Sequence, residues 1–156
     1  NVIVDMFGYS MWYTGFDGAA LSIGRATSPD GIVWTRDPTT AVLAPGGTTQ
    51  DWDNKATAQT SVRRYKKRYL MWYGAYDTSK TDPGPYRVAL AESNDGTHWL
   101  KRGISLELSA DGPDAYSTRD PSVVPWGNGW LMVYVGMGKD YKYRLMGALS
   151  KVCSTE

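Results

Sequence analysis

SPDGIVW, at residues 28–34, returns as SNDGTHW at residues 93–99. Both stretches follow the pattern Ser-x-Asp-Gly-x-x-Trp. Asp-Gly is a strong signal for a tight turn, because glycine adopts positive φ without strain and the Ser and Asp side chains accept hydrogen bonds from nearby backbone amides. We therefore interpret both stretches as hairpins between strands, with each Trp packed between adjacent sheets, and assign them no ligand contact.

The two hairpins belong to a longer internal repeat. MWYTG at residues 11–15 returns as MWYG at 71–74 and as MVYVG at 132–136, at offsets of 60 and 61 residues. A short strand is expected before each copy and another after it. The expected first strands are 2–4, 61–63 and 122–124, and the third strands are 22–27, 87–92 and 144–149. A fourth strand is expected at the two hairpins, ending on Trp34 and Trp99.

Four short strands in about 60 residues, repeated in the same order, are typical of a β-propeller. No stretch has a sustained helical period, so the sequence predicts an all-β fold. The blades have four antiparallel strands each, and the chain holds just under three of them. They form one partial propeller domain over residues 1–156, divided into blade A (1–40), blade B (55–103) and blade C (115–152).

An incomplete propeller exposes the sheet faces at its two ends, which favours association. Because the chain does not start with Met, we expect that its start was processed or cut. Two explanations stay open: the chain is a piece of a longer protein with further blades, or it is a half-propeller that closes as a homodimer.

Bulk composition excludes several classes of partner. The net charge is +1, with 17 basic and 16 acidic residues, which gives no reason to expect nucleic acid or an anionic membrane. No apolar run approaches the roughly 20 residues of a membrane span.

Cys153 is the single cysteine, so no internal disulfide forms. No Gly-rich phosphate loop and no Cys/His cluster is present, and no residue specifies a metal or another cofactor. The cellular compartment stays open.

MWYTG, IGRATSPDGIVWTRDP and RDPSVV together resemble the five-bladed β-propeller glycosidases. These are glycoside hydrolase families 43, 32 and 68 and, nearest, the family 130 mannoside phosphorylases and hydrolases. The resemblance covers the whole chain but only about half of the family domain. It implies a carbohydrate ligand and cleavage of glycosidic bonds, by hydrolysis or phosphorolysis, through carboxylates that face the central channel. An inner-strand Asp of the Arg-Asp-Pro motif would lie at the substrate.

Asp120 is the leading catalytic candidate, because it opens the predicted inner strand of blade C in Thr118-Arg119-Asp120-Pro121. The resemblance implies that its carboxylate stabilises the transition state or tunes another acid. Arg119, beside it, would reach a sugar hydroxyl or a phosphate. The alternative is that Asp-Pro only starts a strand.

The equivalent position of blade B holds Gln59, an amide, and that of blade A would precede residue 1. The catalytic set is therefore incomplete. A non-catalytic carbohydrate-binding module and a purely structural propeller module stay open beside the enzyme.

Two further acids, Asp53 and Asp114, are separated by 61 residues on the loops that enter blades B and C. These loops lie on the same side as the expected site, so both are candidate substrate-binding residues. Capping of the loop is the favoured interpretation. Trp52 and Tyr116 lie next to them and either stack on a sugar ring or pack in the protein interior.

The loops after the second strands carry acids that are interpreted as solvated: Asp17, Asp77 and Asp140. The basic run at residues 63–68 is interpreted as a solvated hairpin tip, and His98 as a surface residue.

Overall fold

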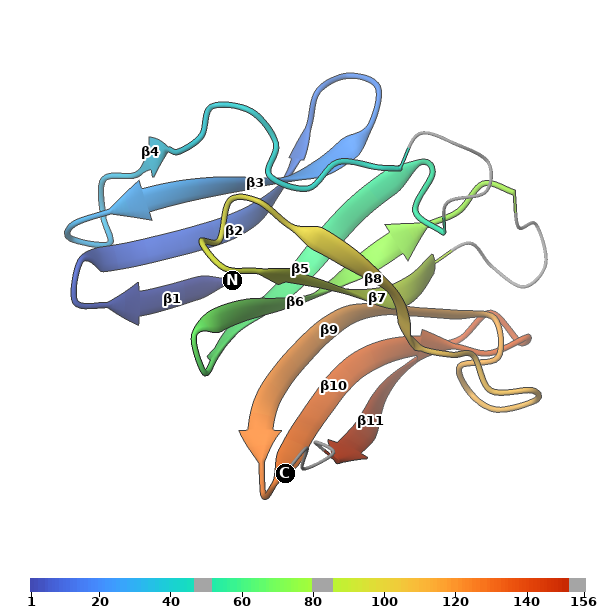
Figure 1. Ribbon diagram of the computed structural model, residues 1–156. Coiled ribbons are helices and arrows are strands. Elements are labelled where there is room, and N and C mark those ends of the chain that lie inside the picture. The colour runs from blue at the N-terminus through green and yellow to red at the C-terminus, as the bar shows by residue number, and fades with distance from the viewer. Residues whose placement is uncertain (47–51, 80–85, 152–156) are drawn as a thin grey trace.

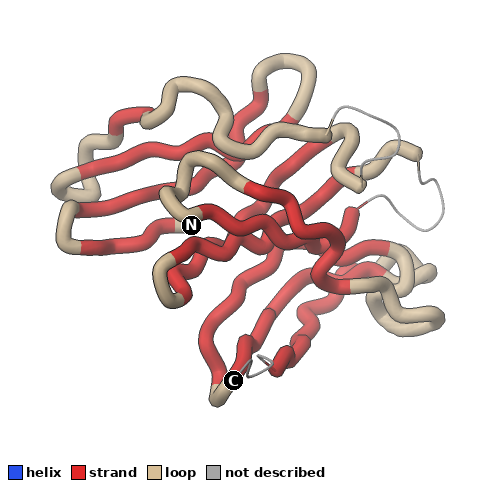
Figure 2. Tube along the Cα trace, in the orientation of Figure 1, coloured by secondary structure: helices blue, strands red, loops and turns tan. Residues whose placement is uncertain are grey.

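The structure is a computed structural model that describes residues 1–46, 52–79 and 86–151. Every regular element in these ranges is a β-strand, which confirms the all-β prediction (Figure 2). Three blades follow one another along the chain, with blade A at one end of the row, blade B in the middle and blade C at the other end (Figure 1). None of the described segments is a helix of the length and hydropathy needed to cross a bilayer.

The strands fall into three blades, and β8 extends blade B to Leu106, beyond the predicted bound of residue 103. Blade A contains β1 (Val2–Asp5), β2 (Gly8–Phe16), β3 (Leu21–Ser28) and β4 (Thr35–Arg36). Blade B contains β5 (Ala56–Tyr65), β6 (Arg68–Tyr76), β7 (Tyr86–Ser93) and β8 (Leu100–Leu106). Blade C contains β9 (Ser117–Trp126), β10 (Gly129–Met137) and β11 (Tyr143–Lys151). Within each blade, consecutive strands pair antiparallel. Blades A and B meet in a single parallel pair, Leu21 with Ala56.

The fourth strands begin after Trp34 and Trp99, whereas the sequence predicted that they end there. The reason lies in the turn. Asp30 Oδ1 accepts hydrogen bonds from the amides of Ile32 and Val33, and Asp95 Oδ1 does the same in blade B. Amides held by the turn are not free to join a strand ladder. The strands start only where this hydrogen bonding stops.

Both Ser-x-Asp-Gly turns have the predicted structural role. Ser28 Oγ accepts from the Gly31 amide at 2.8 Å, and Ser93 Oγ accepts from the Gly96 amide at the same distance. The two glycines have φ of 77° and 79°, a conformation that L side chains rarely adopt. The hydrogen bonds that hold each turn also lower the pKa of its Asp carboxyl.

The hydrophobic core lies between blades because each sheet has two apolar faces. Successive side chains of a strand point to opposite faces, as strand β6 illustrates. Met71 and Tyr73 point into a cluster shared with Trp12 and Ile23 of blade A. The intervening Trp72 points into a second cluster, shared with blade C. Each blade is therefore stabilised by its neighbours, as in a propeller.

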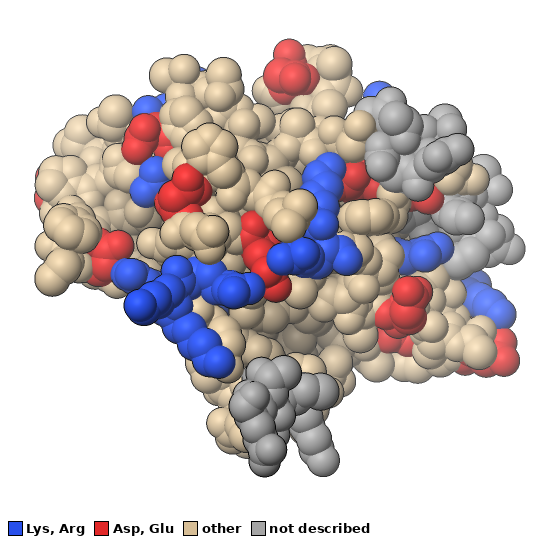
Figure 3. Space-filling view, viewed as in Figure 1, with Lys and Arg blue, Asp and Glu red and all other residues tan. Residues whose placement is uncertain are grey.

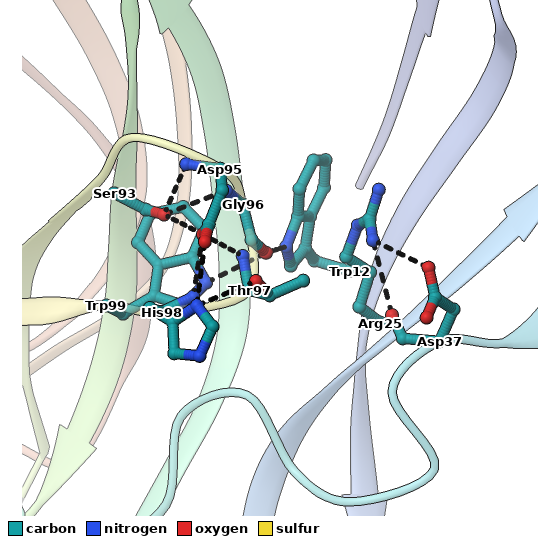
Figure 4. A network of polar contacts seen from close by, with 9 residues as sticks. All are labelled: Trp12, Arg25, Asp37, Ser93, Asp95, Gly96, Thr97, His98 and Trp99. Carbon is teal, nitrogen blue, oxygen red and sulfur yellow. Dashed lines mark hydrogen bonds and ion pairs between the residues drawn. The ribbon is translucent and has the colours of Figure 1, made fainter.

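Trp12 is the central contact between blades A and B (Figure 4). It is 1% exposed, and its indole Nε1 donates to the backbone oxygen of Gly96 at 2.9 Å. The Trp99 ring lies edge-on at 6.2 Å from the Trp12 ring, so the predicted packing of Trp99 between blades is confirmed. On the other side, the Arg25 guanidinium lies 5.8 Å from the centre of the Trp12 ring and pairs with Asp37 at 3.1 Å.

We expect Trp12→Phe to lower the free energy of unfolding by about 2 kcal/mol. The substitution keeps an aromatic ring but removes one of the two indole donors of the Gly96 oxygen, which then keeps only Trp99 Nε1 at 3.1 Å, and the smaller ring leaves space in the buried interface. Urea unfolding followed by far-UV circular dichroism measures the change. Trp126→Phe is the matched control, because Trp126 is 62% exposed and its replacement should change stability little. Equal effects of the two substitutions would contradict the role assigned to Trp12.

Candidate functional site

Strands β5 and β9 each contain a β-bulge at the same place. In β5, the three-residue step from Ala58 to Ser61 lies opposite the two-residue step from Trp72 to Gly74 on β6. In β9, the same irregularity separates Arg119 from Ser122. The extra residues are Gln59 and Asp120 with their neighbours. A bulge bends the strand and redirects the side chain it carries.

Gln59 and Asp120 both adopt a left-handed backbone conformation, with φ of 56° and 53°. Such a conformation is uncommon for a residue other than glycine, so the surrounding structure must hold it in place. In β5 part of that support comes from blade A, because the backbone amide of Gln59 donates to Thr14 Oγ1 of β2 at 2.9 Å. In β9 Pro121 follows Asp120, and a bulge tolerates the absence of its amide hydrogen. The sequence predicted that Asp120 opens a strand; it lies inside one instead, three residues after Ser117.

The two bulges face a cleft of about 350 Å³ where β2, β5 and β9 approach one another. Asp120 is exposed in it, and Gln59 is half-buried. The cleft is lined by Asn1, Met11, Trp12, Tyr13, Thr14, Gln59, Thr60, Asp120 and Pro121. Of the predicted site residues, the structure therefore brings Asp120 and Gln59 together.

Two buried oxygens of this cleft have no hydrogen-bond partner among the described residues. They are Gln59 Oε1 and Thr60 Oγ1. Buried polar atoms are nearly always hydrogen-bonded in folded proteins, so two unpaired oxygens in neighbouring residues set this part of the cleft apart from an ordinary packed strand. Thr60 was not predicted from the sequence, and its position next to the Gln59 bulge is the signal that identifies it.

Arg119 lies beside the cleft but does not line it. Its guanidinium lies between two aromatic rings, 5.6 Å from the centre of Tyr86 on β7 and 4.4 Å from that of Tyr143 on β11. Burial is the main cause that raises the pKa of Tyr86; the neighbouring Tyr76 and the Asp120 carboxylate act in the same direction, and Arg119 opposes them. The cation is thus held where blade B meets blade C, next to the Asp120 bulge.

Asp53 and Asp114 form matching buried contacts instead of lining the cleft. Tyr73 donates its hydroxyl to Asp53 Oδ2 at 3.0 Å, and Tyr134 donates to Asp114 Oδ2 at 2.6 Å. Lys101 pairs with Asp53 at 2.6 Å, and Asp53 Oδ1 also accepts from the Gly46 amide. Each Asp thereby fastens the loop that enters a blade to the second strand of that blade. The tyrosines were missed in the sequence, although they repeat at the same 61-residue spacing as the acids.

The charge state of the Asp114 carboxyl follows from these contacts. Burial favours the protonated acid, but hydrogen bonds from Ser109 and Tyr134 outweigh burial, so the pKa of Asp114 lies below its ordinary value. In return, burial and the contact with Asp114 raise the pKa of Tyr134 well above that of a free phenol. At neutral pH the pair is a phenol donating to a carboxylate.

The other predicted residues lie in local contacts. Trp52 packs against the core between blades A and B and donates to the Tyr73 hydroxyl at 3.3 Å, while the Tyr116 ring lies 5.0 Å from that of Tyr141. The three loop acids bind within or near their own loops, as follows. Asp17 accepts from the Ala19 and Ala20 amides, Asp77 from Asn54 and Ser79, and Asp140 pairs with Arg144.

The basic run forms the exposed turn between β5 and β6, as predicted. Lys66 and Lys67 are exposed there, and Lys and Arg side chains gather over this region in Figure 3. His98 is a surface residue whose Nδ1 lies 2.7 Å from Asp95 Oδ2. Within the described ranges, no group of three or more His, Cys, Asp or Glu side chains is arranged to hold a metal ion.

Comparisons of sequence find no protein-family profile and no curated protein that matches the chain. Comparison of structure does find relatives of the fold. A family 117 glycoside hydrolase of Zobellia galactanivorans superposes with a TM-score of 0.81 and 17% identity, over 97% of this chain and 51% of the other. The family 32 β-fructofuranosidase of Bombyx mori gives 0.74 and 18%, over 99% and 34%. The β-1,2-mannobiose phosphorylase of Listeria innocua gives 0.73 and 14%, over 96% and 39%.

These matches confirm the predicted resemblance at the level of the fold. The chain has the β-propeller fold of these glycoside hydrolases and phosphorylases. It spans between about a third and a half of the length of these structures. At such low identity, the structural similarity shows the fold alone and gives no evidence of an activity.

We expect Asp114→Asn to flatten the acid side of the stability profile. Since the pKa of Asp114 is lowered by folding, its carboxylate contributes stability above the unfolded pKa of about 3.9, and this contribution is lost as pH falls through the folded pKa. The variant should therefore melt at a lower temperature than the parent at pH 6, and the difference should shrink towards pH 2. Thermal unfolding between these pH values measures it. Asp111→Asn, at a side chain that is 88% exposed, is the control that should leave the profile unchanged. A constant difference at every pH would contradict the assignment.

Proposed function

We propose that the chain is part of a carbohydrate-active protein and that its cleft between β2, β5 and β9 binds a sugar beside Asp120. The observation that carries this proposal is the pair of matched bulges. They turn Gln59 and Asp120, both in a left-handed conformation, towards the same cleft. Strained residues of this kind concentrate at functional sites, because function is what maintains a conformation that costs free energy.

The composition of the cleft supports a polyhydroxylated ligand. Gln59 Oε1 and Thr60 Oγ1 are buried in residues that line the cleft and have no hydrogen-bond partner among the described residues, and the exposed Asp120 carboxylate lines the same cleft. Sugar hydroxyls are donors that suit the exposed carboxylate, and they suit an amide or hydroxyl oxygen that a side-chain rotation turns towards the cleft. Proteins of the same fold are described as glycoside hydrolases and as a phosphorylase.

In the enzymatic form of the proposal, the protein cleaves glycosidic bonds by hydrolysis or phosphorolysis. Asp120 is the channel-facing carboxylate and stabilises positive charge that develops on the sugar ring. Arg119, stacked between Tyr86 and Tyr143, fixes the strand at the bulge and so positions Asp120. Substrate roles for Asp53, Asp114, Trp52 and Tyr116 stay predictions.

A second candidate, a carbohydrate-binding module without catalysis, has one observation in its favour. Glycoside cleavage in its common form uses two carboxylic acids. Among the described residues that line the cleft, Asp120 is the one acid, and the equivalent bulge carries the amide Gln59. Amide and carboxylate side chains together bind sugar hydroxyls without supplying both an acid and a base.

The two functions are separated by measuring turnover and binding on the same protein. Turnover is followed with a panel of nitrophenyl glycosides, with and without inorganic phosphate, and binding with the parent monosaccharides by calorimetry. If the enzyme is correct, Asp120→Asn should lower kcat/KM by at least about 100-fold, because a catalytic carboxylate contributes that much or more. If the binding module is correct, the parent binds sugar without turnover, and both Asp120→Asn and Gln59→Ala weaken binding.

Asp111→Asn is the matched control for both measurements, because this exposed Asp pairs with Lys139 and does not line the cleft. It should change neither rate nor affinity. A parent protein that turns over or binds none of these sugars would contradict the proposal. So would sugar binding that survives Asp120→Asn and Gln59→Ala unchanged.

A further inference from the structure

A second pocket lies on blade B, away from the cleft. It has a volume of about 250 Å³, and its lining includes Arg68 of β6, Glu92 of β7 and Arg102 of β8. Strand β6 begins at Arg68, whereas the bulge of β5 lies opposite the step from Trp72 to Gly74 on the same strand. These two points are roughly 15 Å apart along β6, at about 3.3 Å per residue. The pocket and the cleft share no lining residue, so they are separate sites.

Two arginines converge on one carboxylate oxygen in this pocket. Arg68 Nη1 donates to Glu92 Oε2 at 3.1 Å, and Arg102 Nη2 donates to the same oxygen at 2.9 Å. Glu92 lies on β7, the strand between those of the two arginines. Its side chain is 22% exposed, whereas those of Arg68 and Arg102 are 53% and 47% exposed. The carboxylate is thus the most buried of the three groups, with a guanidinium on either side.

The two cations exceed what Glu92 can neutralise. A carboxylate pairs most strongly with one guanidinium, through two parallel hydrogen bonds. Here the arginines share a single oxygen, although each guanidinium carries five N–H donors. Among the described residues that line the pocket, Glu92 is the one acid. His98 also lines it, but its Nδ1 already lies 2.7 Å from Asp95 Oδ2. One unit of positive charge and several donors are therefore left for a ligand.

The surface next to the pocket is also basic. Arg64, Lys66 and Lys67 lie in and before the turn that leads into β6, and all three are exposed. Lys and Arg side chains gather over this turn (Figure 3). The whole chain has a net charge of only +1, so the cations are concentrated here and not spread evenly. Concentrated positive charge of this kind attracts anions from solution.

We propose that this pocket binds one tetrahedral oxyanion, a sulfate or a phosphate group, between Arg68 and Arg102. Such a group has enough oxygens to accept from both guanidinium groups at once, whereas the two oxygens of a carboxylate suit one. The pocket is smaller than the roughly 300–1,000 Å³ of sites for whole small molecules, so it suits a single charged group. A bound anion also offsets the repulsion between two cations held on one oxygen.

The oxyanion is either a free ion or an ester group on a larger molecule. Both present the same oxygens to the arginines, so the structure assigns the group and the experiment identifies its source. The proposal goes beyond the carbohydrate function of the cleft. It depends only on the pocket and holds whether or not the cleft binds a sugar.

The ¹⁵N-labelled chain is titrated with sodium sulfate and, separately, with inorganic phosphate, against sodium chloride at constant ionic strength. The Nε–Hε resonances of Arg68 and Arg102 and the backbone amides of residues 92–94 report on the pocket directly. We expect these resonances to shift and to saturate in the millimolar range. Arg68→Gln and Arg102→Gln should each raise the dissociation constant about tenfold or more, because each removes charge-assisted hydrogen bonds. Both side chains are about half exposed, and far-UV circular dichroism checks that the variants fold.

Glu92→Gln is expected to change the affinity in the opposite direction. Its amide oxygen still accepts from both arginines, but the negative charge beside the anion is gone, so sulfate should bind at least about threefold more tightly. Lys139→Gln is the matched control. It removes the same unit charge as the arginine substitutions, from a side chain that pairs with Asp111 and does not line the pocket. It should leave the affinity unchanged.

Dextran sulfate and neutral dextran identify the source of the oxyanion. Dextran sulfate that shifts the same resonances more than about tenfold more tightly than free sulfate would support an ester group on a polymer, and equal affinity per sulfate would support the free ion. Neutral dextran should leave the pocket resonances unchanged, which separates this site from sugar binding in the cleft. Three results would overturn the proposal: no shifts in the millimolar range, equal shifts with chloride, or binding that survives both arginine substitutions. Unchanged or weaker binding to Glu92→Gln would overturn it as well.

Discussion

The structure depends on one constraint: each blade is a sheet with two apolar faces, and only another blade can cover them. Trp12 is where this constraint is met most completely, since its ring fills the space between blades A and B and its indole binds the Gly96 turn. The turn presents the Gly96 backbone oxygen, which also accepts from Trp99 Nε1 at 3.1 Å, and no side chain. A Cβ on Gly96 would lie 2.9 Å from Trp12 Cζ2, so the glycine serves both the turn and the interface. The hairpin and the tryptophan are parts of one contact.

The sequence repeat that made the fold predictable arises from these contacts between blades. Strand β6 is buried and apolar from Leu70 to Ala75, because successive side chains point to opposite faces and both faces of blade B are covered. The corresponding strands of blades A and C repeat this apolar pattern. Turn chemistry placed the hairpins, although the fourth strands start after Trp34 and Trp99 and not before them. The period could be seen from the sequence; the end of hydrogen bonding within a turn could not, since it depends on which amides the Asp side chain holds.

The candidate site was predictable only in part, and for a physical reason. The repeat aligned Asp120 with Gln59, and the structure brings both to one cleft. The bulges were not foreseen, because left-handed backbone is usually signalled by glycine and these positions hold an acid and an amide. For Asp53 and Asp114 the spacing left a substrate role and loop capping open, with capping favoured. The sequence did not show their tyrosine partners, because this pairing depends on contacts between segments about 20 residues apart.

Packing and site are connected through the inner strands. Strands β5 and β9 each contact the preceding blade at a threonine and, five residues later, at the backbone amide of a valine. The bulge that lines the cleft lies between these two residues. The strand is fixed on both sides of the bulge, at Thr57 and Val62 in one blade and at Thr118 and Val123 in the other. Gln59 and Asp120 lie between these two contacts in their strands. The contacts that hold neighbouring blades together therefore also hold in place the strand segments that carry the bulge residues to the cleft.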